Sequence, residues 1–402
     1  MKTILCLLVW SLLLWPLPAA IAAEPDAPPP PKPVYIGIDA EFGYRDSTSA
    51  EAIRYGVQIA MAEINRQGGV LGGRPLKLVV RANNSVPARS LVNIEELAAI
   101  PDLVAVFCGR FSPPIVASLP LVHQRRLILL DPWAAGDDLV DNGHKPNYVF
   151  RLSLRDSDAL AVMIDRARRL GASRIGLLLL NTSWGRSSQK AAENYLRSMK
   201  DSAPLLVGQA WFNWQDQSLL ERYQSLRHSG AEAILMVTNA ETAAILVNEV
   251  AQLPPEERLP LIFHWGITGG SFPEMVGTNL EKVDHSVVQT YSFVGKTDAI
   301  AGKVLAAARE MFGIPGPRQV PSPVGMAHAY DLTRILARAI DLAGTTDREK
   351  VHDALEQVRD YPGLVRFFRR PFTPERHEAL ARGDLFMARY DPQDHALVPI
   401  AP

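Results

Sequence analysis

The sequence predicts an α/β protein with two doubly wound parallel-sheet lobes. Short apolar runs typical of buried strands alternate with amphipathic helical patterns along the chain. The alternation starts again after residue 152, which indicates a second sheet. A chain of 402 residues is also too long for one typical hydrophobic core.

The first unit shows this pattern clearly. Tyr35–Ile38 is an apolar strand, and Thr48 with Glu51 three positions later is typical of a capping box. An apolar stripe at helical spacing follows: Ile53, Val57, Ala60, Met61 and Ile64. Glycines then turn the chain into a second strand, Leu76–Val80. We therefore expect a βαβ unit and a parallel sheet.

The later elements follow the same logic, with apolar runs as strands and periodic segments as helices. Further strands are expected at Leu103–Phe107, Leu127–Leu130, Tyr148–Leu152, Ile175–Leu180, Leu206–Trp211, Ala233–Val237 and Leu261–His264, and Val287–Tyr291 is expected to be a crossover. Helices are expected at Pro87–Ala99, from Ser112 onward, and at Asp158–Leu170, Ser187–Met199, Ser218–His228, Glu241–Leu253, Ala299–Phe312, Val324–Leu342 and Thr346–Val358. Short strands are expected within Leu385–Pro399.

The N-terminus is typical of a cleaved signal peptide. Lys2 precedes the apolar run Ile4–Leu14, which is too short to span a bilayer, and small residues at Ala20–Ala23 offer a cleavage site. We assign residues 1–23 to the signal peptide and 24–33 to a proline-rich tether. The mature protein is expected to be exported and soluble, with Cys108 as a single, inert buried thiol.

Composition and motifs argue against several function classes. A net charge of −1 gives no footprint for nucleic acid. The chain has no G-x-S-x-G elbow and no G-x-G-x-x-G after its first strand. Its nine histidines never fall within five residues of one another, so no local pair of metal ligands is visible. We expect no enzyme activity, no cofactor and no metal.

Several loops at predicted strand ends carry aromatic or polar residues. In open α/β sheets, ligands bind outside the carboxyl ends of the strands. Phe111 and Ser112, Trp133, Trp184 and Trp265 all follow such ends. A helix starting at Ser112 would offer free N–H groups to a carboxylate. We expect a ligand in the cleft between two lobes that close by a hinge.

A family resemblance agrees with this interpretation. Gly56–Gly73 resembles the opening of type I periplasmic binding proteins of the leucine/isoleucine/valine-binding kind, which are the substrate-binding components of ABC transporters. Supporting segments are Leu129–Ala135, Phe150–Leu152, Asp156–Asp158 and Ser183–Gly185. The likeness covers nearly all of residues 34–399 and is weak after 290.

The resemblance implies a three-crossover hinge, with lobe 1 at 34–151 and 287–382 and lobe 2 at 152–286 and 383–400. It also implies ligand contacts. Ser112 matches a serine that holds the ligand carboxylate, and Ala134 and Ala135 match the loop for the amino acid head group. Trp184 matches the aromatic residue that covers the ligand, while Thr238 and Asn239 follow a strand that carries a further contact.

One position departs from the family pattern. Amino-acid binders of this family usually place an acid where this chain has Trp265. A buried ammonium without a countercharge would be costly, so either Glu41 or Asp131 serves instead, or the ligand lacks an ammonium. Trp133, Trp184, Trp265 and Phe111 could then enclose an aromatic ring or cage a quaternary ammonium.

The predicted function is a periplasmic solute-binding protein of an ABC uptake system. Its ligand would be a small organic molecule (an amino acid, an amide or an aromatic acid), and its partner an inner-membrane permease. The alternative is a sensory receptor subunit that signals to a membrane histidine kinase. We expect a monomer.

Overall fold

The computed structural model describes residues 31–45 and 47–400. The predicted signal peptide and residues 24–30 of the predicted tether lie outside this part of the chain. No helix among the described residues combines the length and the apolar content needed to cross a membrane.

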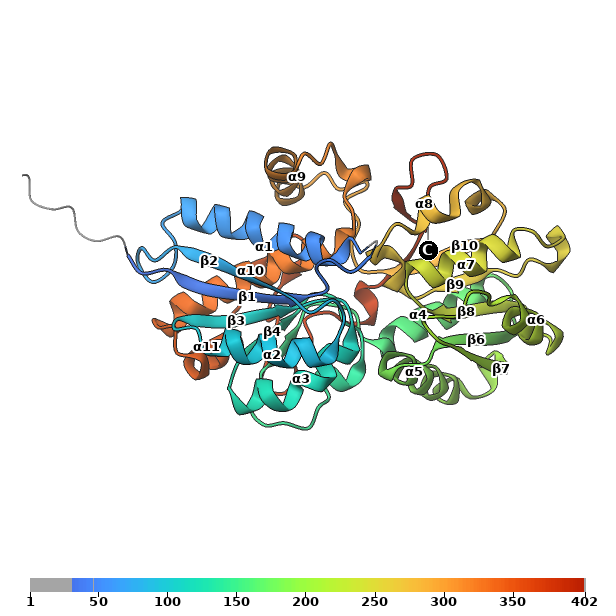
Figure 1. Ribbon diagram of the computed structural model, residues 1–402, viewed down its shortest axis with the longest axis horizontal. Helices are drawn as coiled ribbons and strands as arrows, with labels where there is room; N and C mark the ends of the chain where they lie inside the picture. Colours follow the sequence, from blue (N-terminus) through green and yellow to red (C-terminus); the bar gives the residue numbers. More distant parts are fainter. Residues whose placement is uncertain (1–30, 46, 401–402) are drawn as a thin grey trace, which may run out of the picture. The chain divides into compact units, whose positions relative to one another are not determined.

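The first sheet has five parallel strands in the order β2-β1-β3-β4-β5 (Figure 1). They are β1 (Val34–Ala40), β2 (Leu76–Ala82), β3 (Leu103–Cys108), β4 (Ile128–Asp131) and β5 (Val149–Arg151). Every residue of the central strand β3 is buried. That pattern is expected of a parallel strand covered on both faces.

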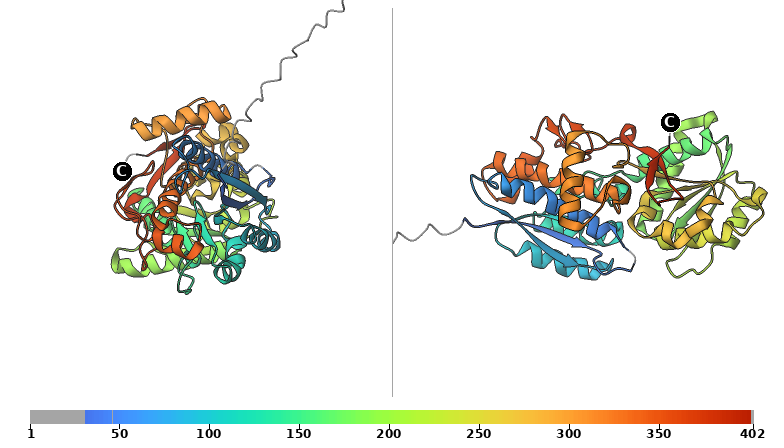
Figure 2. Two further views of the ribbon diagram at one scale, coloured as in Figure 1. Left: turned by 90° about the vertical axis from the view of Figure 1, so that its left-hand side faces the viewer. Right: turned by 90° about the horizontal axis from the view of Figure 1, so that it is seen from above.

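Helices cover both faces of this sheet. On one side α1 packs against α10, and α10 against α11; on the other side α2 packs against α3. α9 lies over α1 and outside this layer in the views of Figure 2. The bounds are α1 (Ser49–Arg66), α2 (Pro87–Ala98), α3 (Ser112–Gln124), α9 (Ala299–Phe312), α10 (Pro323–Ala343) and α11 (Arg348–Leu355).

The second sheet has seven strands in the order β14-β13-β10-β9-β8-β6-β7. They are β6 (Arg174–Leu180), β7 (Leu205–Phe212), β8 (Ala233–Val237), β9 (Leu261–Phe263), β10 (His285–Gln289), β13 (Phe386–Tyr390) and β14 (Leu397–Pro399). The β10–β13 and β13–β14 pairs are antiparallel, and the other pairs are parallel. β10 therefore belongs to this sheet up to Gln289.

Helices also cover the second sheet. α4 packs against α5, and α7 packs against α6 and α8. Their bounds are α4 (Asp156–Arg169), α5 (Ser183–Met199), α6 (Leu220–His228), α7 (Ala240–Val250) and α8 (Phe272–Val276). A hairpin joins β11 (Tyr361–Pro362) and β12 (Phe367–Phe368). Short 3-10 turns lie at Asp137–Leu139, Lys200–Ser202, Pro255–Glu257, Trp265–Gly269, Gly277–Glu281, Pro317–Gln319 and Arg382–Asp384.

The predicted starts of α1 and α3 are confirmed, whereas the predicted capping box of α1 and the predicted start of α5 are wrong. Thr48 precedes α1 but makes no side-chain cap, because its Oγ1 lies 2.6 Å from Ser322 Oγ on a distant segment. Ser112 is the first residue of α3, as expected, and its hydroxyl accepts a hydrogen bond from the Gly136 N–H. Trp184 lies in the first turn of α5, which starts four residues earlier than expected because Thr182 caps it. A long-range partner thus replaced the cap of α1, and an unrecognised cap moved the start of α5.

The two sheets contact each other through loop backbone and side chains. The Thr48 N–H donates to Gly269 O at 3.0 Å. Ser322 Oγ donates to Thr268 O at 2.8 Å, and the Asp137 N–H donates to Ser187 Oγ at 3.1 Å. These bonds join segments of the first sheet's layer to the turn after β9 and to α5.

A buried ion pair lies where β5 ends. Arg151 is fully buried, and its Nε lies 2.8 Å from Glu378 Oε2. Its Nη1 donates to Ala134 O at 3.2 Å and to Gly136 O at 2.8 Å. One guanidinium therefore holds the loop after β4 and the 377–379 segment together.

We expect Arg151→Met to lower the free energy of unfolding by roughly 3 to 5 kcal/mol, because it leaves Glu378 buried and unpaired. Urea denaturation measures this loss. Arg125→Met is the matched control: it removes an exposed pair with Glu95 and should cost less than about 1 kcal/mol. Equal losses in the two variants would contradict a structural role for the buried pair.

Candidate ligand-binding site

A cavity lies between loops of the two sheets. Its volume is about 10 Å³. That is room for about one water molecule. Its walls are Arg110, Phe111, Ser112, Pro113, Trp133, Ala135, Thr182, Trp184, Trp214, Asn239, Trp265 and Gly266.

Most residues chosen from the sequence meet at this cavity. Those in its wall are Phe111, Ser112, Trp133, Ala135, Trp184, Asn239 and Trp265. Ala134, Thr238, Glu41 and Asp131 are buried but do not line it. A ligand-binding role for any of them stays a prediction.

The start of α3 offers fewer donors than its position suggested. Pro113 and Pro114 follow Ser112, and proline has no N–H, so the first turn has lost two of its free donors. Ser112 is only 4% exposed. Since its oxygen accepts from the Gly136 N–H, its own O–H is free to donate to a ligand.

Arg110 is the main polar residue of the wall that the sequence analysis did not select. Its side chain is 1% exposed, and its guanidinium carbon lies 4.6 Å from the centre of the Phe111 ring. Nη1 makes a long contact of 3.5 Å to Gly266 O. Nε and Nη2 have no hydrogen-bond acceptor among the described residues. Arg110 could have been selected from the sequence, because it lies in the same strand-end loop as Ser112.

Two glutamates neutralise Arg110 without satisfying its donors. Glu41 Oε1 lies 3.9 Å from Nε, and Glu241 Oε1 lies 4.0 Å from Nη2. Glu41 is already hydrogen-bonded to Ser49, to Ser47 at 3.3 Å and to the Arg110 N–H at 3.3 Å. It is therefore a countercharge for Arg110 and not an acid facing the cavity.

Asp131 does not line the cavity but holds the backbone of the loop that does. Its Oδ1 accepts from the N–H groups of Trp133 at 3.0 Å and Ala134 at 2.7 Å. Complete burial raises the pKa of Asp131 to about 7, although Arg151 and these two hydrogen bonds oppose the rise. Asp131 therefore fixes the loop that carries Trp133.

Trp184 is held by a buried acid. Its indole N–H donates to Asp156 Oδ1 at 3.1 Å, and His264 Nε2 lies 3.2 Å from the same oxygen. Burial raises the pKa of Asp156, while the His264 ring opposes the rise. This contact could not be predicted from the sequence, because the three residues come from separate elements.

Aromatic rings form most of the remaining wall. Trp133 follows a strand of the first sheet and Trp265 a strand of the second, and their ring centres are 5.4 Å apart. Trp214 lies edge-on to Phe111 at 6.1 Å and is 40% exposed. Trp214 was missed, although it follows the end of β7 as the other tryptophans follow theirs. These rings could therefore contact a planar apolar group once the cavity has opened.

The turn after β9 closes the remaining side of the cavity. A Cβ on Gly266 would lie 2.3 Å from Thr238 O, so only glycine fits here. Asn239 precedes α7, and its Nδ2 has no acceptor among the described residues. Asn239 therefore adds a second free donor beside Arg110.

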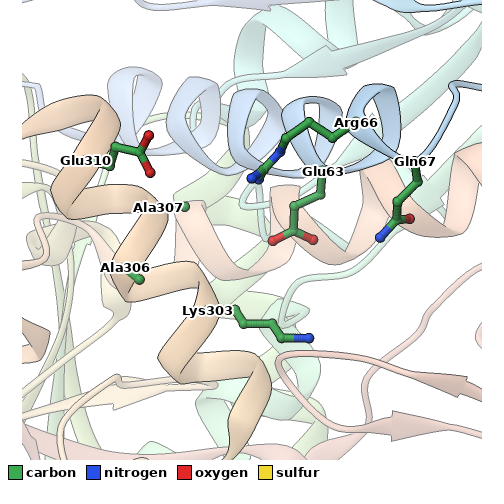
Figure 3. A pocket seen from close by; sticks show the side chains of 7 residues that line it. All are labelled: Glu63, Arg66, Gln67, Lys303, Ala306, Ala307 and Glu310. Carbon is green, nitrogen blue, oxygen red and sulfur yellow. The ribbon is translucent and has the colours of Figure 1, made fainter.

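A second hollow lies between α1 and α9 (Figure 3). Its walls are Glu63, Arg66, Gln67, Lys303, Ala306, Ala307 and Glu310. Glu63 is engaged by Tyr330 at 2.8 Å and by Arg334 at 2.7 Å. The hollow is open to solvent and offers no buried free donor, so it is a weaker candidate.

The chain is similar to known proteins along most of its length. The model of a family described as periplasmic binding protein matches residues 34–395. A type 1 periplasmic binding protein from Bordetella pertussis Tohama I has a TM-score of 0.81 at 20% identity, covering 92% of this chain and 100% of its own. None of the curated proteins matches the chain.

Two further solved structures carry named ligands or ligand classes. The leucine-binding protein LivK from Thermotoga maritima MSB8 has a TM-score of 0.76 at 18% identity and covers 92% of this chain and 98% of its own. An ABC transporter solute-binding protein from R. palustris in complex with 4-hydroxybenzoate has a TM-score of 0.75 at 15% identity, covering 92% and 96%. These likenesses confirm the predicted fold class.

Asp131 leads to a pH prediction. Its folded pKa of about 7 lies above its ordinary value of 3.8, so the folded state keeps a proton that the unfolded chain releases within this window. Stability is therefore lost as pH rises from about 4 to about 7, by roughly 2 to 3 kcal/mol between pH 5 and pH 8. Asp131→Asn should remove this loss, because the amide oxygen still accepts both N–H bonds and cannot ionise.

Urea denaturation of both proteins at pH 5 and pH 8 measures the difference. Asp138→Asn, which changes an exposed carboxyl group of the same loop, is the control and should leave the wild-type pH dependence in place. An Asp131→Asn variant with unchanged pH dependence would show that this carboxyl is already ionised in the fold.

Proposed function

Because the chain belongs to the periplasmic binding protein family, we propose that it captures a small aromatic carboxylate in the periplasm and delivers it to an ABC permease. The observation that carries this proposal is the buried Arg110 guanidinium at the cavity, whose Nε and Nη2 lack acceptors within the described part of the chain. The role is binding and release, without bond-making.

The unpaired donors at the cavity favour an anion. Buried polar groups without partners are costly, and a ligand carboxylate would satisfy two guanidinium donors at once. Ser112 and Asn239 supply further donors beside Arg110. A cationic ligand such as a quaternary ammonium has no oxygen that could accept hydrogen bonds from these donors.

The same wall disfavours an amino acid. No carboxylate is among the residues that line the cavity in the described chain, and Glu41 is engaged by Ser47, Ser49 and Arg110. An amino acid ammonium would lose its hydration there without gaining a countercharge. This supports the second of the two explanations for Trp265.

The aromatic rings favour a planar body for the ligand. Trp133, Trp184 and Trp265 are almost fully buried around the cavity, and indole rings contact other aromatic rings favourably in stacked or edge-on geometry. The R. palustris relative, whose structure holds 4-hydroxybenzoate, has a ligand of this class. Other relatives hold isoleucine or leucine, so the fold alone does not choose the ligand.

Ligand entry requires movement. The reachable space of about 10 Å³ is too small for an aromatic acid. The lobes must open and the Trp133–Trp265 contact must separate before a ligand can enter. Binding should therefore change tryptophan fluorescence, and closure around the ligand would create the surface that a permease recognises.

We expect 4-hydroxybenzoate or benzoate to raise the melting temperature, and leucine and neutral benzamide to have little effect. Benzamide is the matched ligand control, because it keeps the ring and lacks the charge. Arg110→Gln should weaken benzoate binding at least about 100-fold, since two charge-assisted hydrogen bonds are lost. Isothermal titration calorimetry measures the dissociation constants.

Arg186→Gln is the control variant: it removes an exposed arginine near the start of α5 and should bind as the wild type does. Melting without ligand shows whether each variant is folded. Stronger binding of leucine than of any aromatic acid, or full benzoate affinity in Arg110→Gln, would refute the proposed ligand class.

A further inference from the structure

Two histidines and a glutamate converge inside the first lobe, away from the ligand cavity. His352 lies on α11, Glu356 follows at the end of that helix, and His377 lies on the segment that pairs with β5. One donor atom from each lies within 4.8 Å of the other two. Both histidines are buried, at 3% and 4% exposure.

The outer nitrogen of each ring already has an acceptor. His352 Nδ1 lies 2.9 Å from Asp353 Oδ1, and His377 Nδ1 lies 2.9 Å from Val149 O. Histidines that bind metals commonly donate their second N–H in this way to a carboxylate or a backbone carbonyl, which fixes the ring. The other nitrogen of each ring is Nε2, and both Nε2 atoms lie near Glu356 Oε1.

The inner nitrogens also face oxygen atoms. His377 Nε2 lies 3.0 Å from Glu356 Oε1, and His352 Nε2 lies 3.7 Å from the same oxygen and 3.1 Å from Asn147 O. A neutral imidazole carries one N–H, so it can donate to only one of its two acceptors. The two ring centres are 5.7 Å apart, so the two Nε2 atoms lie close enough to share one ion with Glu356.

Aromatic rings enclose the two imidazoles. The Phe150 ring stacks on His377 at 4.0 Å, and the Tyr148 ring lies 4.8 Å from His352. These contacts hold both imidazole rings in place. A divalent cation bound by the two Nε2 atoms would be neutralised in part by Glu356.

We propose that His352, Glu356 and His377 form a binding site for a divalent transition-metal ion of the zinc class. Two imidazole nitrogens and one carboxylate oxygen are a donor set that Zn²⁺ accepts, with one position left for water or a further oxygen. This site could not be recognised in the sequence, because its histidines lie in separate segments.

The position of the site indicates its role. It joins α11, the start of β5 and the 377–379 segment, and His377 is the neighbour of Glu378, the partner of Arg151. A bound ion would therefore fasten the segment that crosses near the interlobe connection. We infer a structural metal site that stabilises this lobe and makes no contact with the cavity.

The test uses untagged protein treated with a chelator and then titrated with ZnCl₂. We expect about one Zn²⁺ per chain by calorimetry and a rise of at least about 3 °C in melting temperature. CoCl₂ should give the visible absorption of a four- or five-coordinate Co²⁺ ion. His352→Gln and His377→Gln should each lose the rise in melting temperature and the Co²⁺ absorption. Their affinity for Zn²⁺ should fall at least about tenfold.

Asp353→Asn is a milder variant, because Asp353 is 71% exposed and only orients His352. It should weaken Zn²⁺ binding about tenfold while leaving the fold intact. His395→Gln, which removes a half-buried histidine 3.6 Å from Glu274, is the matched control and should bind as the wild type does. Absence of Zn²⁺ binding in the wild type, or equal binding in the His352 and His377 variants, would overturn the proposal. Aromatic-acid binding is measured separately, so failure of one proposal leaves the other intact.

Discussion

The fold depends on the guanidinium of Arg151. It is fully buried at the end of β5, pairs with Glu378 and donates to carbonyl groups on both sides of Ala135. The loop that carries Trp133 and the segment that carries His377 are thus fixed by one side chain. The cavity and the proposed metal site therefore share a structural support. Removing one partner of a buried ion pair greatly lowers the free energy of unfolding.

The cavity shows a different use of burial. Arg151 has acceptors for its donors, whereas Arg110 keeps Nε and Nη2 without any among the described residues. Glu41 and Glu241 balance the charge of Arg110 from about 4 Å and leave those donors available. Asp156 in turn fixes the indole of Trp184. A polar anchor and oriented rings are what recognition of an aromatic anion requires.

Much of this could be predicted from the sequence. The alternation of apolar runs and helical stripes is a local pattern, and it gave the fold class and most elements within a few residues. Since strand ends gather at one edge of a parallel sheet, Ser112, Trp133, Trp184 and Trp265 could be placed together. Helix caps were less predictable: the Thr48 side chain contacts Ser322 instead of capping α1.

By itself, then, the sequence determined the two-sheet architecture and the aromatic character of the site, because both follow from periodicity and from residues next to strand ends. Only the tertiary structure decided which polar groups are left without partners. It paired Glu41 with Arg110 and brought His352 beside His377. Such pairings join segments far apart in the chain, and hydrogen-bond satisfaction is a property of the packed interior that no local pattern encodes.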